Sequence, residues 1–266
     1  MIAQFEHAYI SMIKNILDTG EYKHTRNAET IATFGQVLKV TNLEDEFPLL
    51  RGRKMFYNGV FGELGAMLQG ATHIDEFKER GCNYWDQWAD ENGNLNIDYG
   101  SSWLDFNGVN QVEELINGLK TDPNDRRHII TGWRPDRLKE LSLPCCHLLY
   151  QWYVRDEKYL DMIWYQRSVD VMVGLPSDII FAAAWNILIA QETDYIPGDI
   201  TFMLGDTHIY TSHIPNTHKY LRQAKEAAAD TICLQAKYNS QFLMEARDIE
   251  ITKYDPMDAI KFEVHA

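Results

Sequence analysis

Leu143-Pro144-Cys145-Cys146-His147 is the stretch of this chain that says most about its fold and its chemistry. Two short segments follow it, Gln166-Arg167-Ser168-Val169-Asp170 and Gly174-Leu175-Pro176-Ser177-Asp178. Together they bring a thiol, a guanidinium group and carboxylates into a region that is otherwise built from apolar segments. This combination predicts a reactive site assembled on buried strands.

Apolar segments with strand or helix character surround these motifs. Residues 148–154 and 159–165 are rich in β-branched and aromatic residues, and the polar link 155–158 is typical of a hairpin turn. Residues 179–191 are apolar nearly all round, which predicts a buried central helix. Two further strands are expected, at 128–133 and 200–204.

The rest of the chain alternates between helical and strand patterns. Residues 5–17 and 55–68 have apolar residues at helical spacing, and a glycine follows each segment. No internal repeat, low-complexity run or long linker interrupts the sequence. We therefore predict one α+β domain over residues 1–266. The remaining expected elements are a strand at 30–40, a loop or short helix at 85–93, and helices at 112–119 and 213–228.

Composition and charge limit the possible partners. Hydrophobic residues make up 45% of the chain and charged residues 24%, as in ordinary soluble globular proteins. The net charge of -14 argues against a nucleic-acid polymer as the main partner, because phosphate binding needs a basic surface. A small anionic substrate needs only a local cluster of arginines. No signal layout is found in residues 1–14, and the longest apolar stretch, 179–190, is too short to span a bilayer. We predict a cytoplasmic protein.

The cysteine pattern argues against disulfides and metals. Four cysteines in a chain of this length do not form a disulfide framework, and adjacent cysteines rarely bridge each other without strain. No CxxC pair occurs, so a structural zinc site is not expected, and we predict no metal. The four are Cys82, Cys145, Cys146 and Cys233.

Cys146 has two interpretations. A single cysteine is usually a small buried apolar side chain. Here His147 follows directly and four arginines occur nearby in the sequence, and nearby cations lower the pKa of a thiol and favour a nucleophilic thiolate. On spacing alone, Cys145 could be the reactive thiol instead. The four arginines are Arg126, Arg127, Arg134 and Arg167.

Several charged residues also have both a functional and a structural interpretation. Arg167 and Ser168 would supply forked donors and a hydroxyl suited to phosphate oxygens. The pair Arg126-Arg127 could belong to a solvated turn. Glu63 lies in an apolar helical segment, where it is either an exposed edge residue or a buried acid with a raised pKa.

Aromatic residues raise the same question. Trp85 and Trp88 could be core anchors, or they could face a flat heteroaromatic cofactor. His208 and Tyr210 could contact a sugar hydroxyl or merely satisfy a buried strand end.

Taken in order, these segments resemble the thymidylate synthase family over nearly the whole chain. The resemblance implies a homodimeric α+β domain with a large mixed β-sheet and flanking helices. It also implies a pyrimidine nucleoside monophosphate as substrate and 5,10-methylenetetrahydrofolate as co-substrate. The matching blocks are Arg26, 47–49, Glu63 with 68–70, 85–93, 125–127, 144–147, 166–168 with Asp170, 174–176, 205–210 and 254–256.

The resemblance implies a role for individual residues. Cys146 would attack C6 of the pyrimidine, and Glu63 and Tyr99 would order the proton-transfer water network. The carboxyl-terminal tail would close over the site. The nucleotide would be held by Arg26, Gln166, Arg167, Ser168, His208 and Tyr210, with Arg126 and Arg127 from the partner subunit. Folate contacts would come from Trp85, Asp170, Gly174, Ser177 and His265.

Asp178 departs from the family pattern, which has Asn at this position. The Asn amide accepts from uracil N3–H and donates to O4, whereas cytosine presents an amino donor at position 4. A carboxylate can accept from that amine and from a protonated N3 together, and the same amide would leave a buried mismatch of about 1–3 kcal/mol. Asp here resembles the deoxycytidylate hydroxymethylases, so we predict dCMP as substrate.

Ser177 and His265 are a second departure, because aromatic and small apolar residues respectively are usual there. A more polar folate pocket would admit water, and hydration of the exocyclic methylene would give 5-hydroxymethyl-dCMP. The alternatives are a thymidylate synthase-type methyltransferase on dUMP or dCMP, which produces dihydrofolate, and an inactive nucleotide- or RNA-binding homologue.

Overall fold

A six-stranded mixed sheet organises the chain in the computed structural model, which describes residues 4–227, 235–238, 249–252 and 254–265. The strand order is β1-β2-β6-β5-β4-β3, in which β5 and β6 run parallel and the other neighbours run antiparallel. A separate antiparallel pair is formed by β7 and β8. The strands are β1 (Glu21–His24), β2 (Glu29–Val40), β3 (Ile129–Thr131), β4 (His147–Arg155), β5 (Tyr159–Asp170), β6 (Ile196–Tyr210), β7 (Gln235–Tyr238) and β8 (Ile249–Thr252).

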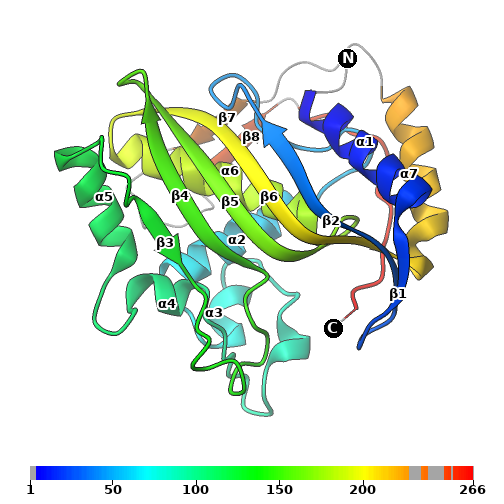
Figure 1. Cartoon of the computed structure of the whole chain (residues 1–266), viewed down its shortest axis with the longest axis horizontal. Helices are drawn as coiled ribbons and strands as arrows, with labels where there is room; N and C mark the ends of the chain where they lie inside the picture. The colour runs from blue at the N-terminus through cyan, green and yellow to red at the C-terminus, as the bar shows by residue number, and fades with distance from the viewer. Residues whose placement is uncertain (1–3, 228–234, 239–248, 253, 266) are drawn as a thin grey trace.

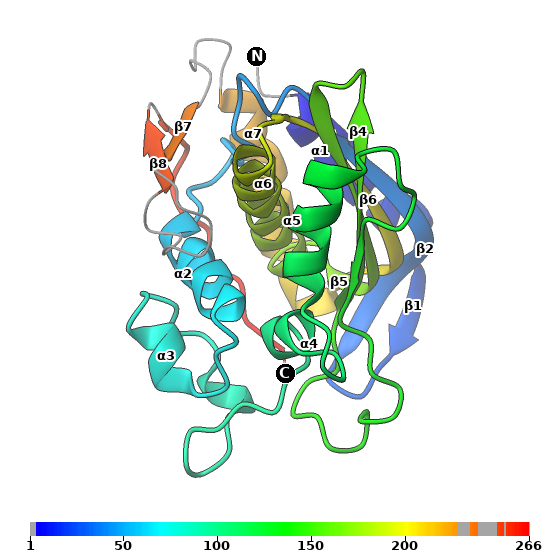
Figure 2. The same cartoon turned by 90° about the vertical axis from the view of Figure 1, so that its left-hand side faces the viewer.

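Helices α2, α5 and α6 lie on one side of this sheet, as Figures 1 and 2 show. The opposite face of β2, β4, β5 and β6 is turned toward the viewer in Figure 1. The helices are α1 (Gln4–Thr19), α2 (Tyr57–Leu68), α3 (Ile74–Lys78), α4 (Gly100–Leu104), α5 (Gln111–Thr121), α6 (Gly174–Glu192) and α7 (Ile214–Glu226), with short 3-10 helices η1 (Asp86–Trp88) and η2 (Thr211–His213).

The crossover from β5 through α6 to β6 is the centre of the fold. Parallel neighbours need such a connection, and α6 supplies it. Nearly every residue of α6 from Ile179 to Ala190 is buried, which explains why this segment is apolar all round. Along β5 alternate side chains face the helix layer, namely those of Leu160, Met162, Trp164 and Gln166.

An aromatic cluster fills the space between the sheet and α6. The rings of Trp103 and Trp185 stack at 4.4 Å, and Tyr150 lies edge-on to Trp185 at 4.9 Å. Trp164 packs against Tyr150 at 4.8 Å. Because each large ring buries much apolar surface in a fixed orientation, this cluster holds β4, β5 and α6 in register beneath the motif-bearing segments.

The predicted α+β fold with a large mixed sheet and flanking helices is confirmed. The central helix begins at Gly174 rather than at residue 179, because Pro176 is well tolerated in a first helical turn. The strand expected at 200–204 runs from Ile196 to Tyr210, whereas the one expected at 128–133 is only Ile129–Thr131. Elements β1, α3, α4, β7 and β8 were not predicted.

Some predictions stay open. Ala228, the last residue of one expected helix, and Cys233 lie outside the described residues. Over the described ranges, no helix combines the length and the apolar character that a membrane span requires. The single domain over residues 1–266 and the cytoplasmic location are two further predictions that stay open.

Candidate active site

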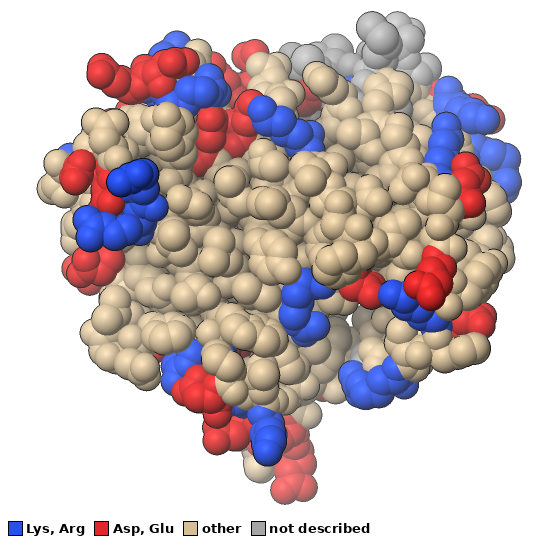
Figure 3. All heavy atoms as spheres, viewed as in Figure 1, with Lys and Arg blue, Asp and Glu red and all other residues tan. Residues whose placement is uncertain are grey.

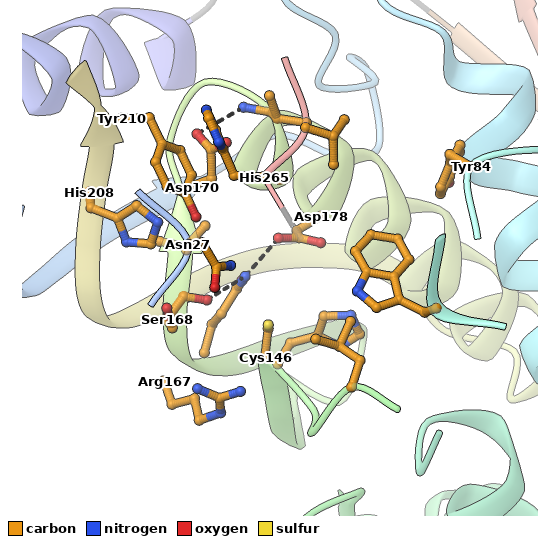
Figure 4. Close-up of a pocket in the computed structure, with 18 of the residues that line it drawn as sticks. Asn27, Tyr84, Cys146, Arg167, Ser168, Asp170, Asp178, His208, Tyr210 and His265 are labelled. Carbon is orange, nitrogen blue, oxygen red and sulfur yellow. Dashed lines mark hydrogen bonds between the residues drawn. The ribbon is translucent and has the colours of Figure 1, made fainter. Parts of the chain in front are cut away.

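A pocket of about 360 Å³ opens beside the start of β4 (Figure 4). Segments far apart in the sequence form its wall, because the sheet brings the ends of β4, β5 and β6 together under α2 and α6. Fourteen of the predicted site residues line it: Arg26, Glu63, Trp85, Tyr99, Cys146, Gln166, Arg167, Ser168, Asp170, Gly174, Asp178, His208, Tyr210 and His265.

Three predicted residues do not line this pocket. Arg126 is exposed, and Arg127 is exposed with its Nε donating to both carboxylate oxygens of Asp125 at 2.9 and 3.0 Å. Ser177 instead turns its hydroxyl to the carbonyl oxygen of Val173 at 3.3 Å. Neighbouring positions of α6 face different sides, so Asp178 reaches the pocket and Ser177 does not.

Cys146, not Cys145, is the pocket thiol. The Cys145 side chain is buried and its thiol faces the carbonyl oxygen of Gly132 at 3.5 Å; burial raises its pKa to about 12. The Cys146 sulfur points into the pocket below Asp178 (Figure 4). The two cysteines lie just before β4, where the chain bends at Cys146, and their thiols take different directions.

The expected lowering of the Cys146 thiol pKa is wrong, because burial outweighs the nearby cation. Burial raises the pKa of Cys146, and the charge of Arg167 opposes this while Asp178 reinforces it. His147 supplies no charge, because its buried ring sits against the Tyr150 hydroxyl at 2.6 Å and burial lowers its pKa to about 3. Arg167 is thus the cation that favours the thiolate form of Cys146 here.

Arg167 lines the pocket and is fixed by two hydrogen bonds to backbone carbonyl groups. Its Nε donates to the carbonyl oxygen of Cys145 at 2.7 Å, and its Nη2 donates to that of Pro144 at 3.0 Å. These two bonds tie β5 to the loop that carries the thiol. They leave the rest of the guanidinium group to face an anion beside Ser168, which also lines the pocket.

Of the two alternatives considered for Glu63, the structure favours the acid with a raised pKa, in a half-buried position at the pocket. Its carboxylate accepts from the Tyr84 hydroxyl at 2.7 Å and from the Trp85 indole N–H at 2.8 Å. Burial raises its pKa to about 7, although both hydrogen bonds oppose that change. Trp85 also tilts against Trp88 at 5.2 Å, so it is both a core anchor and part of the pocket wall.

Asp178 is a second half-buried acid, in the first turns of α6. The side-chain amide of Gln166 donates to its Oδ2 at 2.7 Å, drawn as a dashed line in Figure 4. Burial raises the pKa of Asp178 to about 7, and the charges of Glu63 and Asp170 raise it further. Two carboxyl groups with a pKa near neutrality thus share one pocket with a thiol, an arrangement typical of proton-transfer chemistry.

The carboxyl-terminal tail covers one side of the pocket. His265 hydrogen-bonds the Ser212 hydroxyl through Nε2 at 2.9 Å, and its ring lies 4.1 Å from that of Tyr210. His213 contacts the carbonyl oxygen of Glu263 at 2.8 Å. On β6, His208 Nδ1 contacts the carboxylate of Asp206 at 2.8 Å, and this contact lowers the pKa of Asp206.

A family model described as thymidylate synthase matches residues 7–266. The chain belongs to the thymidylate synthase family. Members of this family transfer a one-carbon unit to a pyrimidine nucleotide, with methylenetetrahydrofolate as co-substrate. The described residues contain no group of three or more His, Cys, Asp or Glu that could hold a metal ion.

Several residues that line this pocket were not predicted from the sequence. Asn27 follows the predicted Arg26, and Tyr84 precedes the predicted Trp85. Both could have been found as sequence neighbours of predicted site residues. Leu143 and His147 flank the cysteine pair. For Val173 and Val264, apolar residues in apolar surroundings, the sequence carries no signal.

Proposed function

We propose that this protein is a deoxycytidylate 5-hydroxymethyltransferase that takes its one-carbon unit from 5,10-methylenetetrahydrofolate. The observation that carries the proposal is Asp178, a half-buried carboxyl group in the same pocket as the Cys146 thiol. Thymidylate synthases resemble this chain elsewhere but have Asn at that position. The acid is the feature that a uracil-specific pocket would not need.

Asp178 suits the edge of cytosine. With a pKa of about 7 it can exist in either protonation state near neutral pH, so one proton can be shared between the acid and N3 of the ring. The amino group at position 4 then meets a carboxylate oxygen. Against uracil, the same oxygen would meet the lone pairs of O4, a buried mismatch of about 1–3 kcal/mol. Protonation at N3 also withdraws electrons from C6 and favours thiolate addition there.

The proposed reaction begins at Cys146. Its thiolate bonds to C6 of dCMP, and the electron pair moves to C5, which bonds to the methylene carbon of the folate. Loss of the C5 proton into the water network ordered by Glu63 and Tyr99 expels tetrahydrofolate and leaves an exocyclic methylene. Water adds to that carbon as the C6–S bond breaks. The sum is dCMP plus methylenetetrahydrofolate plus water, giving 5-hydroxymethyl-dCMP and tetrahydrofolate.

Hydration is favoured over reduction by the polar tail. His265 places a ring with two nitrogen atoms at the pocket, where family members usually have a small apolar residue. One of those nitrogens is bonded to Ser212. We propose that this side of the pocket admits water to the exocyclic methylene. Trp85, Asp170 and Gly174, which line the pocket, would contact the folate.

The nucleotide is held at the opposite side in this proposal. Arg26, Arg167 and Ser168 bind the 5′-phosphate, and His208 with Tyr210 binds the deoxyribose 3′-hydroxyl. All five residues line the pocket.

A homodimer is part of the proposal. The uncovered face of the sheet exposes a row of apolar side chains, in which Val37, Met203 and Tyr165 are neighbours across β2, β6 and β5. Figure 3 shows this face as mostly uncharged, with charged residues gathered toward its rim. A contiguous apolar patch of this kind marks a protein interface. A second copy seated there would bring Arg126 and Arg127 to the pocket of its partner.

Steady-state kinetics with dCMP and dUMP test the substrate. We expect kcat/KM to favour dCMP, and Asp178→Asn to shift the preference toward dUMP by about tenfold or more. The matched control is Asp156→Asn, the same chemical change at an exposed turn where a positive φ of 54° suits Asn. A wild-type enzyme that prefers dUMP would disprove the substrate assignment.

The product distinguishes hydroxymethyl from methyl transfer. Mass spectrometry of the nucleotide should show addition of CH₂O, with tetrahydrofolate as the other product. Growth of the dihydrofolate absorbance band during turnover would instead establish the methyltransferase alternative. Absence of any turnover with either nucleotide would leave the binding homologue.

A further inference from the structure

Two buried side chains, Trp164 and Gln166, are connected to Asp178 by successive hydrogen bonds. The indole Nε1 of Trp164 donates to Oε1 of Gln166 at 3.1 Å. The Nε2 of Gln166 donates to Oδ2 of Asp178 at 2.7 Å and to the carbonyl oxygen of Ser168 at 3.3 Å. Trp164 and Gln166 are almost completely buried and lie two residues apart on β5, so both face the helix layer.

These partners allow only one orientation of the Gln166 amide. An indole N–H can only donate, so it must meet the amide oxygen. A backbone carbonyl can only accept, so the Ser168 side must meet the amide nitrogen. Such pairing of the indole is not automatic in this core, since the indole N–H groups of Trp103 and Trp185 have no hydrogen-bond partner among the described residues.

We infer that Trp164 is a specificity-determining positioning residue, which acts through Gln166 to decide which oxygen of Asp178 can carry a proton. An oxygen that accepts from the Gln166 amide has no room for a proton of its own on that side. The proton of the neutral acid is therefore directed to Oδ1, which makes no hydrogen bond to any other described residue. The inference rests on the proposed function in one respect, that Asp178 meets the base.

A reversed amide would reverse this arrangement. With the Gln166 oxygen turned toward Asp178, the proton would move to Oδ2 and Oδ1 would become a plain acceptor. An acceptor can take the N3–H of uracil but gives nothing to the bare N3 of cytosine. The titratable groups that act on Asp178 are Glu63 from α2, Asp170 from β5, and Cys146 with Tyr150 at β4, and none of them contacts the Trp164 indole N–H through a hydrogen bond.

The same core contains a matched control. Trp152 on β4 is equally buried, and its indole N–H donates to Oδ1 of Asn186 at 3.1 Å. The amide nitrogen of Asn186 donates to the carbonyl oxygen of Leu160 at 3.0 Å. This pair repeats the indole-to-amide arrangement but lies outside the pocket lining. Trp152→Phe therefore removes the same kind of bond at a similar loss of packing.

The test compares Trp164→Phe with Trp152→Phe in the full-length enzyme. Both should lower the urea midpoint by similar amounts. Only Trp164→Phe should reduce the ratio of kcat/KM for dCMP to that for dUMP, by about tenfold, the effect of one hydrogen bond on the discriminating group. Only Trp164→Phe should also shift the ionisation of Asp178 to higher pH in the pH profile of kcat/KM for dCMP. The reason is that a Gln166 amide oxygen turned toward Asp178 favours the protonated acid.

Equal nucleotide ratios and pH profiles in the two variants would overturn the inference. If Trp164→Phe does not fold, Gln166→Met is used in its place, since it removes the amide at nearly constant volume; an unchanged ratio and profile in that variant would overturn the inference equally. A wild-type preference for dUMP would end the substrate proposal alone. In that case the shift of the pH profile in Trp164→Phe, measured with dUMP, still decides the role of Trp164.

Discussion

The Tyr99 hydroxyl accepts a hydrogen bond from the backbone N–H of Cys146 at 2.8 Å. Tyr99 is buried just before α4, and its ring also packs on the ring of His147 at 4.5 Å. A residue distant in sequence thus fixes the backbone from which the pocket thiol projects. The bond also satisfies an N–H in a stretch where the β4–β5 pairing is irregular, between His147 and Leu149.

Tyr99→Phe should slow the reaction more than it weakens binding. The Cys146 N–H would lose its partner in a buried position, at a cost of about 1–3 kcal/mol, and the thiol would lose its fixed approach. We expect kcat to fall about tenfold with little change in the KM for nucleotide. The control is Tyr195→Phe, which removes a hydroxyl bonded to the Leu119 carbonyl oxygen away from the pocket. A kcat equal to that of the control would contradict the role given to Tyr99.

The two adjacent thiols should behave oppositely on substitution. Cys146→Ser should abolish turnover and leave nucleotide binding largely intact, because only this sulfur faces the pocket. Cys145→Ser should remain active and lose about 1 kcal/mol of stability, because a small buried apolar group becomes polar. Mass spectrometry after incubation with a fluorinated cytidylate analogue locates the adduct. A label on Cys145, or no label, would refute the nucleophile assignment.

The two half-buried acids of the pocket, Glu63 and Asp178, should make stability depend on pH. Both Glu63 and Asp178 have a pKa near 7 in the folded chain, above their values of about 4 in an unfolded chain. The folded state therefore holds more protons between these values, and stability falls as pH rises from about 4 to about 7. Glu63→Gln and Asp178→Asn should each flatten this slope, with a gain on the order of 2 kcal/mol at pH 8 and little gain at pH 4. The measurement is urea unfolding across this pH range. If the free energy of unfolding changes with pH equally in wild type and variants, the raised pKa values of Glu63 and Asp178 are excluded.

His265 should influence the folate half of the reaction. His265→Ala removes the bond to Ser212 and the ring contact with Tyr210, so the tail is held less firmly. We expect a KM for methylenetetrahydrofolate raised about fivefold to tenfold, with the KM for nucleotide nearly unchanged. The ratio of methylated to hydroxymethylated product should rise. His218→Ala, an exposed histidine on α7, is the control, and equal kinetics in both variants would remove His265 from the site.

The apolar sheet face should hold the dimer together. Met203→Glu places a charge in the row formed with Val37 and Tyr165, and sedimentation should then show a monomer. Val109→Glu, at an exposed apolar residue away from the sheet, should leave the dimer intact. If arginines cross the interface, mixing inactive Cys146→Ser and inactive Arg127→Ala proteins should restore activity, because each mixed dimer contains one complete site. No recovery on mixing would mean that each subunit works alone.

Much of the architecture was predictable because hydrophobic patterns are local. Residues 148–154 and 159–165 carry the strand signal themselves, and the all-round apolar segment from Ile179 was recognisable as a buried helix. The four exposed residues of β1, Glu21–His24, have no such signal. They form a strand only because β2 lies beside them. The start of α6 at Gly174 was likewise not predictable, because it depends on Pro176 lying in the first turn of the helix.

The sequence alone determined which chemical groups this protein possesses: two neighbouring thiols, an arginine-serine pair and a carboxyl group at Asp178. Only the tertiary structure decided how they act. The path of the chain before β4 turned Cys146 to the pocket and Cys145 to Gly132, and removal from water raised the pKa of Glu63 and that of Asp178 to about 7. Residue types are properties of one position, whereas burial, facing and proton affinity depend on segments that meet only when the chain has folded.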